Sequence, residues 1–290
     1  MELRQLRYFL KAKELMNFTE AAHNLHISQS TLSQQIKQLE DELNTPLFNR
    51  IGNRIVLTEA GALFADYAAL SIKKANDGLA LIQDLNALST GTISVGVSYG
   101  LRNIFTQALV RFTTEYPKLK VRVIYGVSDH LIEMLDHFEL DMILIFKDFT
   151  PASQFKSEEL FSTPMRLITA AKSPLARKKT ITLREIADLP LVLATQGYNT
   201  GHFVGQMFKG KGLEPEFSIE VNDILTMLDL VRTGNWHTVH IETIISEKDF
   251  VAIPIADKNV IRTATMVSLK DAYEKNAMKQ LRMMLKEVMI

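Results

Sequence analysis

Residues 19–50 read TEAAHNLHISQSTLSQQIKQLEDELNTPLFNR and contain two short helical patterns joined by a tight turn. Apolar residues in the second pattern recur at steps of three and four, which places them on one side of a helix: Leu32, Ile36, Leu39 and Leu43. Ser28 is predicted to cap this helix, and Thr19 is predicted to cap the first one. Only residues 26–28 separate the two helices, which is the turn length of a helix-turn-helix.

The polar side of the second helix suits the reading of DNA bases. Its amide and hydroxyl groups can pair with base edges, while Lys37 can contact a phosphate. The amide and hydroxyl groups belong to Gln29, Ser30, Thr31, Ser33 and Gln34. An ordinary solvent-exposed helix has the same polarity, so this helix alone favours neither interpretation.

The segment after the helices supports DNA binding. Pro46 to Arg50 is followed by a hairpin-like stretch that contains Arg54, and such a wing reaches the minor groove or the DNA backbone. With the segments LRQLRYFL, NFTEAAHNLHISQSTLSQQIKQLEDEL, PLFNR and LTEAG, residues 1 to about 61 resemble the winged helix-turn-helix of the LysR-type transcriptional regulators. The resemblance implies sequence-specific binding to double-stranded promoter DNA. The expected DNA contacts are Gln29, Ser30, Thr31, Ser33, Gln34, Lys37, Arg50 and Arg54.

Two features of this region depart from a strongly basic DNA-binding domain. Family members commonly carry Arg at the position of Gln34, so one cationic contact is missing here. The first 60 residues also contain seven basic and seven acidic side chains, with Glu40, Asp41 and Glu42 clustered at the far end of the second helix. We therefore expect weak non-specific affinity and a shallow salt dependence for each domain.

Composition predicts a two-domain cytoplasmic protein. The chain has 290 residues, of which 47% are hydrophobic. No apolar run approaches the roughly 20 residues that a membrane helix needs, so no membrane partner is expected. The sequence contains no cysteine, which excludes disulfides, thiolate nucleophiles and thiol redox sensing. The cysteine-dependent peroxide sensors of the family are therefore excluded as models.

A long helix is predicted from Thr58, its cap, to about Leu88. At about 1.5 Å per residue it would be a rod of roughly 45 Å, too long to bury its apolar stripe against a 60-residue domain. The resemblance implies a dimerisation helix, and the alternative is an intramolecular packing helix. Two paired copies would read two DNA half-sites. Residues 89–91, Ser-Thr-Gly, are predicted to form a hinge.

From Thr92 onward, predicted strands alternate with helices, as in an open α/β sheet. Strands are expected at 93–97, 121–125, 141–146, 166–171, 190–194, 217–221, 250–253 and 262–268, and helices near 105–117, 202–210, 223–233 and from 271. The fold class is α/β with an N-terminal all-α winged helix-turn-helix. The resemblance implies an effector domain of two α/β lobes, similar to type 2 periplasmic binding proteins.

These patterns divide the chain into three parts. Residues 1–58 form the DNA-binding domain, residues 59–90 the linker helix and hinge, and residues 91–290 the effector-binding domain. Within the effector domain, the first lobe comprises about 91–162 and 266–290, and the second about 163–265.

Ligands of open α/β sheets lie beyond the carboxyl ends of the strands. Ser98 and Ser128 each precede a predicted helix, where they either hold an anionic effector such as a small carboxylate or merely cap the helix. Trp236 either lines the cleft or fills the core. The expected effector contacts are Ser98, Tyr99, Ser128, Gly197, Asn199, Thr200 and Trp236.

Other functions find little support in the sequence. His237 and His240 lack a third metal ligand nearby, so no metal site is expected. No nucleotide-binding glycine loop, nucleophile elbow or paired carboxylate is present, so neither an enzyme nor a cofactor is expected. The remaining alternative is a cytoplasmic small-molecule-binding protein without a regulatory DNA role. The resemblance implies a homodimer or homotetramer in which the effector changes the spacing of the DNA-binding pairs and contact with RNA polymerase.

Overall fold

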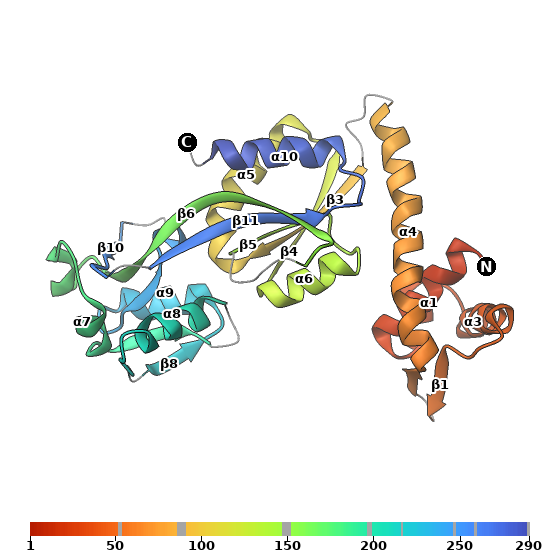
Figure 1. Ribbon diagram of the computed structural model, residues 1–290, viewed down its shortest axis with the longest axis horizontal. Coiled ribbons are helices and arrows are strands. Elements are labelled where there is room, and N and C mark those ends of the chain that lie inside the picture. Colours follow the sequence, from red (N-terminus) through yellow and green to blue (C-terminus); the bar gives the residue numbers. More distant parts are fainter. Residues whose placement is uncertain are drawn as a thin grey trace. The chain divides into compact units, whose positions relative to one another are not determined.

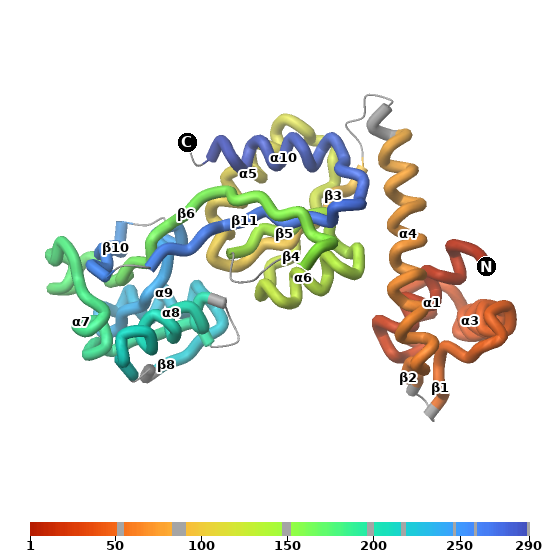
Figure 2. The backbone as a smooth tube through the Cα atoms, viewed as in Figure 1, coloured from red at the N-terminus to blue at the C-terminus, as the bar shows by residue number. Residues whose placement is uncertain are grey.

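The computed structural model describes residues 1–51, 54–85, 91–146, 152–195, 199–215, 217–245, 248–257 and 260–288. The chain divides into two compact units, Met1–Ala87 and Leu88–Ile290 (Figure 1). Figure 2 traces the backbone through both units. None of the helices in the described ranges is long and apolar enough to cross a membrane.

The first unit is a helical domain with a small hairpin. Its elements are α1 (Leu3–Leu15), α2 (Phe18–Asn24), α3 (Gln29–Leu43), β1 (Phe48–Ile51), β2 (Arg54–Leu57) and α4 (Glu59–Leu85). In the apolar stripe of α3, Leu32, Ile36 and Leu39 are fully buried and Leu43 is half-buried, and the helix packs against α1 and α2. Phe48 joins the hairpin to this core, because its ring lies 5.4 Å from the ring of Phe9 and 5.5 Å from that of Phe18.

Helix caps explain where these helices begin. The Ser28 hydroxyl accepts a hydrogen bond from the Thr31 N–H at 3.1 Å, as predicted for α3. For α2 the prediction was wrong: Asn17 is the cap, and its Oδ1 accepts from the N–H groups of Thr19 and Glu20. The helix therefore begins at Phe18, and Thr19 lies inside its first turn. Thr58 caps α4 by accepting from the Gly61 N–H at 2.9 Å.

Glu40 connects α3 to the hairpin. Its Oε1 accepts hydrogen bonds from the N–H groups of Leu47, at 2.7 Å, and Phe48, at 3.0 Å. The sequence indicated only that Glu40 belongs to an acidic cluster at the far end of the helix. Its carboxylate instead holds the start of the wing, since it satisfies two backbone donors in the connecting turn.

The second unit has two lobes, and lobe I is a sheet covered by helices on both faces (Figure 1). Its strands are β3 (Gly91–Ser98), β4 (Leu119–Gly126), β5 (Met142–Phe146), the first part of β6 (Phe155–Ala170) and most of β11 (Ile261–Leu269). One face packs on α5 (Arg102–Glu115) and α10 (Asn276–Glu287), and the other on α6 (Ser128–Asp136). Every residue of β5 is buried, as its unbroken apolar sequence predicted.

Lobe II is built around the second part of β6. β9 (Thr238–Ile241) and β10 (Phe250–Pro254) pair antiparallel with β6, while β7 (Leu191–Ala194) and β8 (Phe217–Val221) form a parallel pair. The helices are α7 (Leu183–Ala187), α8 (Asn199–Lys209) and α9 (Ile224–Arg232), and the short 3-10 turns of the unit are η1 (Tyr99–Leu101), η2 (Pro174–Arg177) and η3 (Glu242–Ile244).

Strands β6 and β11 run from one lobe to the other, side by side (Figure 1). Their antiparallel register extends from Ile261 opposite Pro164 to Leu269 opposite Phe155, with a register shift between Ala264 and Thr265. Register shifts of this kind include β-bulges, which bend a strand and increase its twist. Ala264 and Thr265 also pair with Phe146 and Ile145 of β5, so the irregularity lies where β11 reaches the lobe I sheet.

Candidate functional site

The outer face of α3 presents the polar side chains that the sequence assigned to DNA. Leu32, Ile36 and Leu39 are fully buried, whereas the opposite face is exposed. The predicted DNA contacts Gln29, Ser30, Thr31, Gln34 and Lys37 are all exposed. Ser33 is half-buried. The helix thus packs on one side and leaves amide, hydroxyl and ammonium groups available on the other.

Arg50 lies beside this helix. Its guanidinium donates a hydrogen bond to the Ser33 hydroxyl at 2.9 Å, and its Cζ lies 5.3 Å from the centre of the Phe18 ring. These contacts place an exposed cation next to α3. The backbone of Arg54 pairs with Ile51 in the hairpin, but the Arg54 side chain and residues 52 and 53 lie outside the described residues.

A cavity lies between the two lobes of the second unit, and we call it the inner chamber. It contains about 500 Å³ of empty space, counting its open mouth. The strand ends of both lobes meet here, as the strand-end rule predicted. Side chains that line it include Ser98, Tyr99, Ser128, Phe146, Thr200 and His240.

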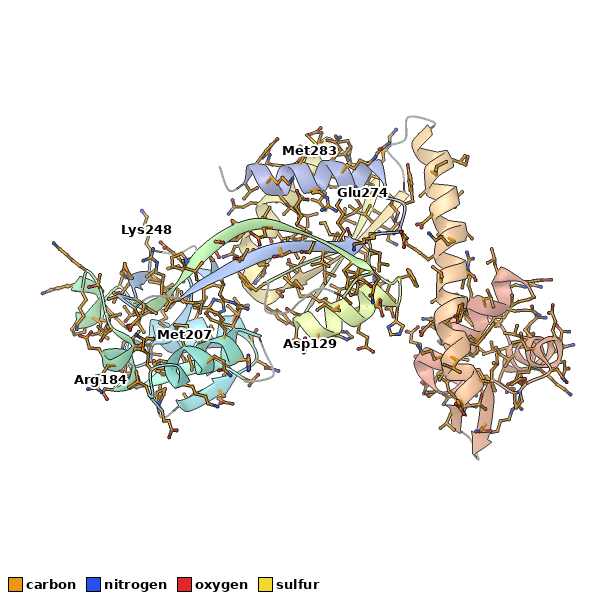
Figure 3. All side chains as sticks on the ribbon, in the orientation of Figure 1. Asp129, Arg184, Met207, Lys248, Glu274 and Met283 are labelled. Atoms are coloured by element: carbon orange, nitrogen blue, oxygen red, sulfur yellow. The ribbon has the colours of Figure 1, made fainter. Side chains whose placement is uncertain are left out.

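Ser98 and Ser128 face each other in the inner chamber. Their Oγ atoms are 3.3 Å apart, and the residues are 9% and 2% exposed. Ser98 precedes η1 without making a side-chain cap, and Ser128 is the first residue of α6, whose cap position is Val127. Neither hydroxyl therefore serves as a helix cap, which was the alternative interpretation of both serines. Asp129, the next residue, is exposed on α6 (Figure 3).

His240 contributes a hydrogen-bond donor that the sequence analysis missed. The buried ring accepts the Ile241 N–H at Nδ1, at 2.9 Å, so the neutral imidazole carries its hydrogen on Nε2. Burial, with a further contribution from the charge of Arg262, lowers the pKa of His240 from 6.5 to about 3. The ring is therefore neutral at physiological pH.

Arg262, on β11, lies behind the chamber wall and was also missed. It is 2% exposed, and its Nη1 donates to the Thr200 hydroxyl at 2.9 Å. Its Cζ lies 4.1 Å from the centre of the Phe146 ring and 5.1 Å from that of Phe203. Arg262 thus fixes two lining residues, and places a positive charge beneath the chamber.

The remaining effector predictions have different outcomes. Tyr99 and Thr200 line the chamber. Gly197 lies outside the described residues, and so does the side chain of Asn199, the first residue of α8. Trp236 is absent from the chamber wall and packs against the hydrophobic core, which was the second alternative for it. His237 is buried and bonded to the Thr169 hydroxyl at 2.9 Å, and the described residues contain no group of potential metal ligands.

Family models match almost the whole chain. Residues 3–62 match the model described as "Bacterial regulatory helix-turn-helix protein, lysR family", and residues 86–290 match "LysR substrate binding domain". The transcriptional dual regulator GltC of Bacillus subtilis (strain 168) is 30% identical over 275 residues, with 93% of this chain and 92% of GltC covered. The HTH-type transcriptional regulator BsdA of the same strain is 30% identical over 265 residues, with coverage of 83% and 90%.

Solved structures share the fold. A full-length OxyR variant from Pseudomonas aeruginosa superposes with a TM-score of 0.79 at 22% identity, covering 99% of this chain and 95% of that one. Full-length CbnR in complex with its target DNA gives a TM-score of 0.69 at 22% identity, covering 99% and 100%. Since this chain has no cysteine, the likeness to OxyR carries over no thiol chemistry.

Proposed function

Because this chain belongs to the LysR family of bacterial transcriptional regulators, and is therefore a sequence-specific DNA-binding regulator and not an enzyme, we propose that a small anion in the inner chamber controls it. A carboxylate is the simplest group of this kind. The family match to the helix-turn-helix argues against the alternative of a small-molecule-binding protein without a DNA role.

The pair of buried serine hydroxyls carries this proposal. Ser98 and Ser128 place two hydroxyls at the start of α6, where the helix dipole favours negative charge. His240 adds a neutral N–H donor to the same wall. Among the described residues that line the chamber, Asp223 is the only carboxylate, and it caps α9 by accepting from the Thr226 N–H and hydroxyl, each at 2.7 Å. The wall thus offers mainly donors, which complements an acceptor-rich anion.

Isothermal titration tests this assignment. We would titrate the full-length protein with acetate, succinate and benzoate, and then repeat the titrations with Ser98→Ala and Ser128→Ala. Each variant should bind about tenfold more weakly, because it loses one hydrogen bond to a charged group. Ser157→Ala, at an exposed serine on β6, is the matched control and should bind like the parent. Unchanged affinity in both chamber variants would rule out the serine pair as the anion site.

The lobes supply a mechanism for transmitting ligand binding. An anion held by lobe I residues at Ser98 and Ser128 and by lobe II residues at Thr200 and His240 favours a closed arrangement of the lobes. β6 and β11 join the lobes and carry the register shift near Ala264, where we propose that the unit bends. In a homodimer or homotetramer, closure would change the spacing between DNA-binding pairs, and hence DNA bending and contact with RNA polymerase.

Dimer formation through α4 is part of this proposal. The helix has 27 residues and carries large apolar side chains that remain exposed in the single chain. Leu63 is 66% exposed and Tyr67 is 71% exposed, and they lie one turn apart. A second copy of the helix would cover them and would bring two α3 helices to two half-sites of cytoplasmic chromosomal DNA.

Genomic DNA fragments retained by the purified protein test the DNA-binding surface. The fragments should be enriched in a small number of sites, and the double variant Ser33→Ala, Gln34→Ala should lose that enrichment. The double variant removes two polar groups from α3 without touching its buried stripe. Equal enrichment by both proteins would show that base reading occurs elsewhere.

A further inference from the structure

The inner chamber adjoins a second cavity, which we call the outer chamber. It contains about 1310 Å³ of empty space, counting open solvent. Tyr99, Gly100, Asp223 and Ile224 line both chambers, so the two cavities are neighbours that share a wall. A ligand long enough to occupy both chambers would pass beside these four shared residues.

Apolar side chains dominate the outer chamber. Its wall includes Tyr125, Leu225, Leu228, Ile244, Ile245 and Phe250. The Tyr99 and Tyr125 rings are stacked, with centroids 6.2 Å apart and an interplanar angle of 25°. They present aromatic surface from lobe I opposite the aliphatic side chains of α9 in lobe II.

Two residues of this wall have apolar side chains that remain partly exposed to solvent. Leu225 is 56% exposed in the first turn of α9, and Tyr99 is 37% exposed after β3. Scattered exposed apolar residues are ordinary, but here they converge on one cavity. The wall also contains the polar residues Arg102, Asn103, Thr106 and Asp223. The Asn103 side chain donates to the carbonyl oxygens of Thr243 and Ile244 and so links the lobes.

We infer that the effector is an amphipathic anion, with its charged head in the inner chamber and an aliphatic or aromatic tail in the outer chamber. The inference rests on the proposed function, which assigns only the anionic head group. It adds that the head group belongs to a molecule with an apolar tail. The tail packs against Tyr99 and Leu225, so it is covered by both lobes. Burial of the tail would then further stabilise the closed arrangement of the lobes, which the anion also favours.

A homologous series of ligands tests the tail. We would titrate the full-length protein with acetate, butanoate, hexanoate and octanoate, and with the alcohols butan-1-ol and octan-1-ol. Affinity for the carboxylates should rise by up to about fourfold for each added methylene that becomes buried. Leu225→Asn should remove most of this rise in affinity with chain length, while the affinity for acetate stays unchanged. Val110→Asn, at a residue 60% exposed on α5, is the matched control and should keep the full gain.

The possible outcomes distinguish failure of the tail site from failure of the anionic head site. If carboxylates bind with an affinity independent of chain length, or if Leu225→Asn weakens acetate and octanoate equally, the outer chamber does not hold a tail and the inference is overturned. If carboxylates fail to bind while octan-1-ol binds more tightly than butan-1-ol, the tail site stands, but the anionic head and the proposed function fail. If neither series gains affinity with length, the inference is also overturned.

Discussion

Two buried histidines should make the stability of the effector unit dependent on pH. Burial lowers the pKa of both His237 and His240, the latter from 6.5 to about 3. Above pH 6.5 both rings are neutral whether the chain is folded or unfolded. Below it the unfolded chain takes up protons that the folded rings exclude, so the free energy of unfolding should fall by up to about 1.4 kcal/mol per pH unit for each histidine.

Urea denaturation at pH 7.5, 6.5 and 5.5 measures this effect. His240→Gln removes one titrating ring, so its free energy of unfolding should fall less steeply below pH 6.5 than that of the parent protein. Comparing the two proteins cancels the carboxylates that titrate in the same range. Parallel curves for parent and variant would mean that His240 is protonated equally easily in both states.

Glu40 should stabilise the DNA-binding unit through its two backbone hydrogen bonds. Glu40→Ala leaves the N–H groups of Leu47 and Phe48 without their acceptor, at a cost of about 1–3 kcal/mol in the free energy of unfolding. Glu40→Gln keeps an acceptor oxygen and should cost less. Thermal unfolding monitored by circular dichroism provides the measurement. Asp41→Ala, at the exposed neighbour, should cost little, and an equal loss in both would refute a specific role for Glu40.

Local patterns predicted part of the candidate site, and residues distant in sequence supplied the rest. Ser98 and Ser128 could be found because each lies where a strand gives way to a helical turn: Ser98 ends β3, and Ser128 begins α6. Arg262 could not be found in this way, because it reaches Thr200 only after β11 has crossed between the lobes. In the sequence, His240 suggested only a weak metal site. Its role as a hydrogen-bond donor could not be predicted, because the Ile241 hydrogen bond that sets its tautomer depends on the folded backbone.

At the scale of elements, the exposed stripe of α4 should control assembly. Leu63→Glu and Tyr67→Glu together would place two carboxylates in the proposed dimer interface, where burying them is costly. We expect the dimer to weaken by about a hundredfold or more, as measured by sedimentation velocity across a concentration series. Leu225→Glu is the control, because this exposed leucine lies in the outer chamber. A double variant that assembles like the parent would place the interface elsewhere.

Periodicity predicted the elements whose burial is uniform and failed where burial changes along an element. All of β5 is buried, and so are Leu32, Ile36 and Leu39 on one side of α3, so the patterns of these two elements are clear. β6 begins at Phe155, eleven residues before the predicted start at 166. The prediction missed its first part because that part is largely polar and, after Phe155, mostly exposed or half-buried. β9 was not predicted, since it is a four-residue strand whose burial comes from pairing with β6. α10 begins at Asn276 and not at 271.

For the whole molecule, a balanced charge makes DNA affinity depend on a small number of well-placed cations. The chain has 33 basic and 33 acidic residues, so no general positive field draws it to DNA. If Lys37, Arg50 and Arg54 each contact a phosphate in both copies of a dimer, log K should fall with log salt concentration with a slope of about −5.

The effect of removing one cation tests this view of affinity. Lys37→Gln should make the slope shallower by about 2 for a dimer, because two phosphate contacts are lost, while the preference among DNA sites should change little. Fluorescence anisotropy with a retained DNA fragment between 50 and 200 mM salt would give both quantities. Lys120→Gln, at an exposed lysine on β4, changes net charge equally and should leave the slope unaltered. Equal slopes for Lys37→Gln and the parent would mean that Lys37 points away from the phosphates, and the wing arginines would then have to supply the electrostatic contacts.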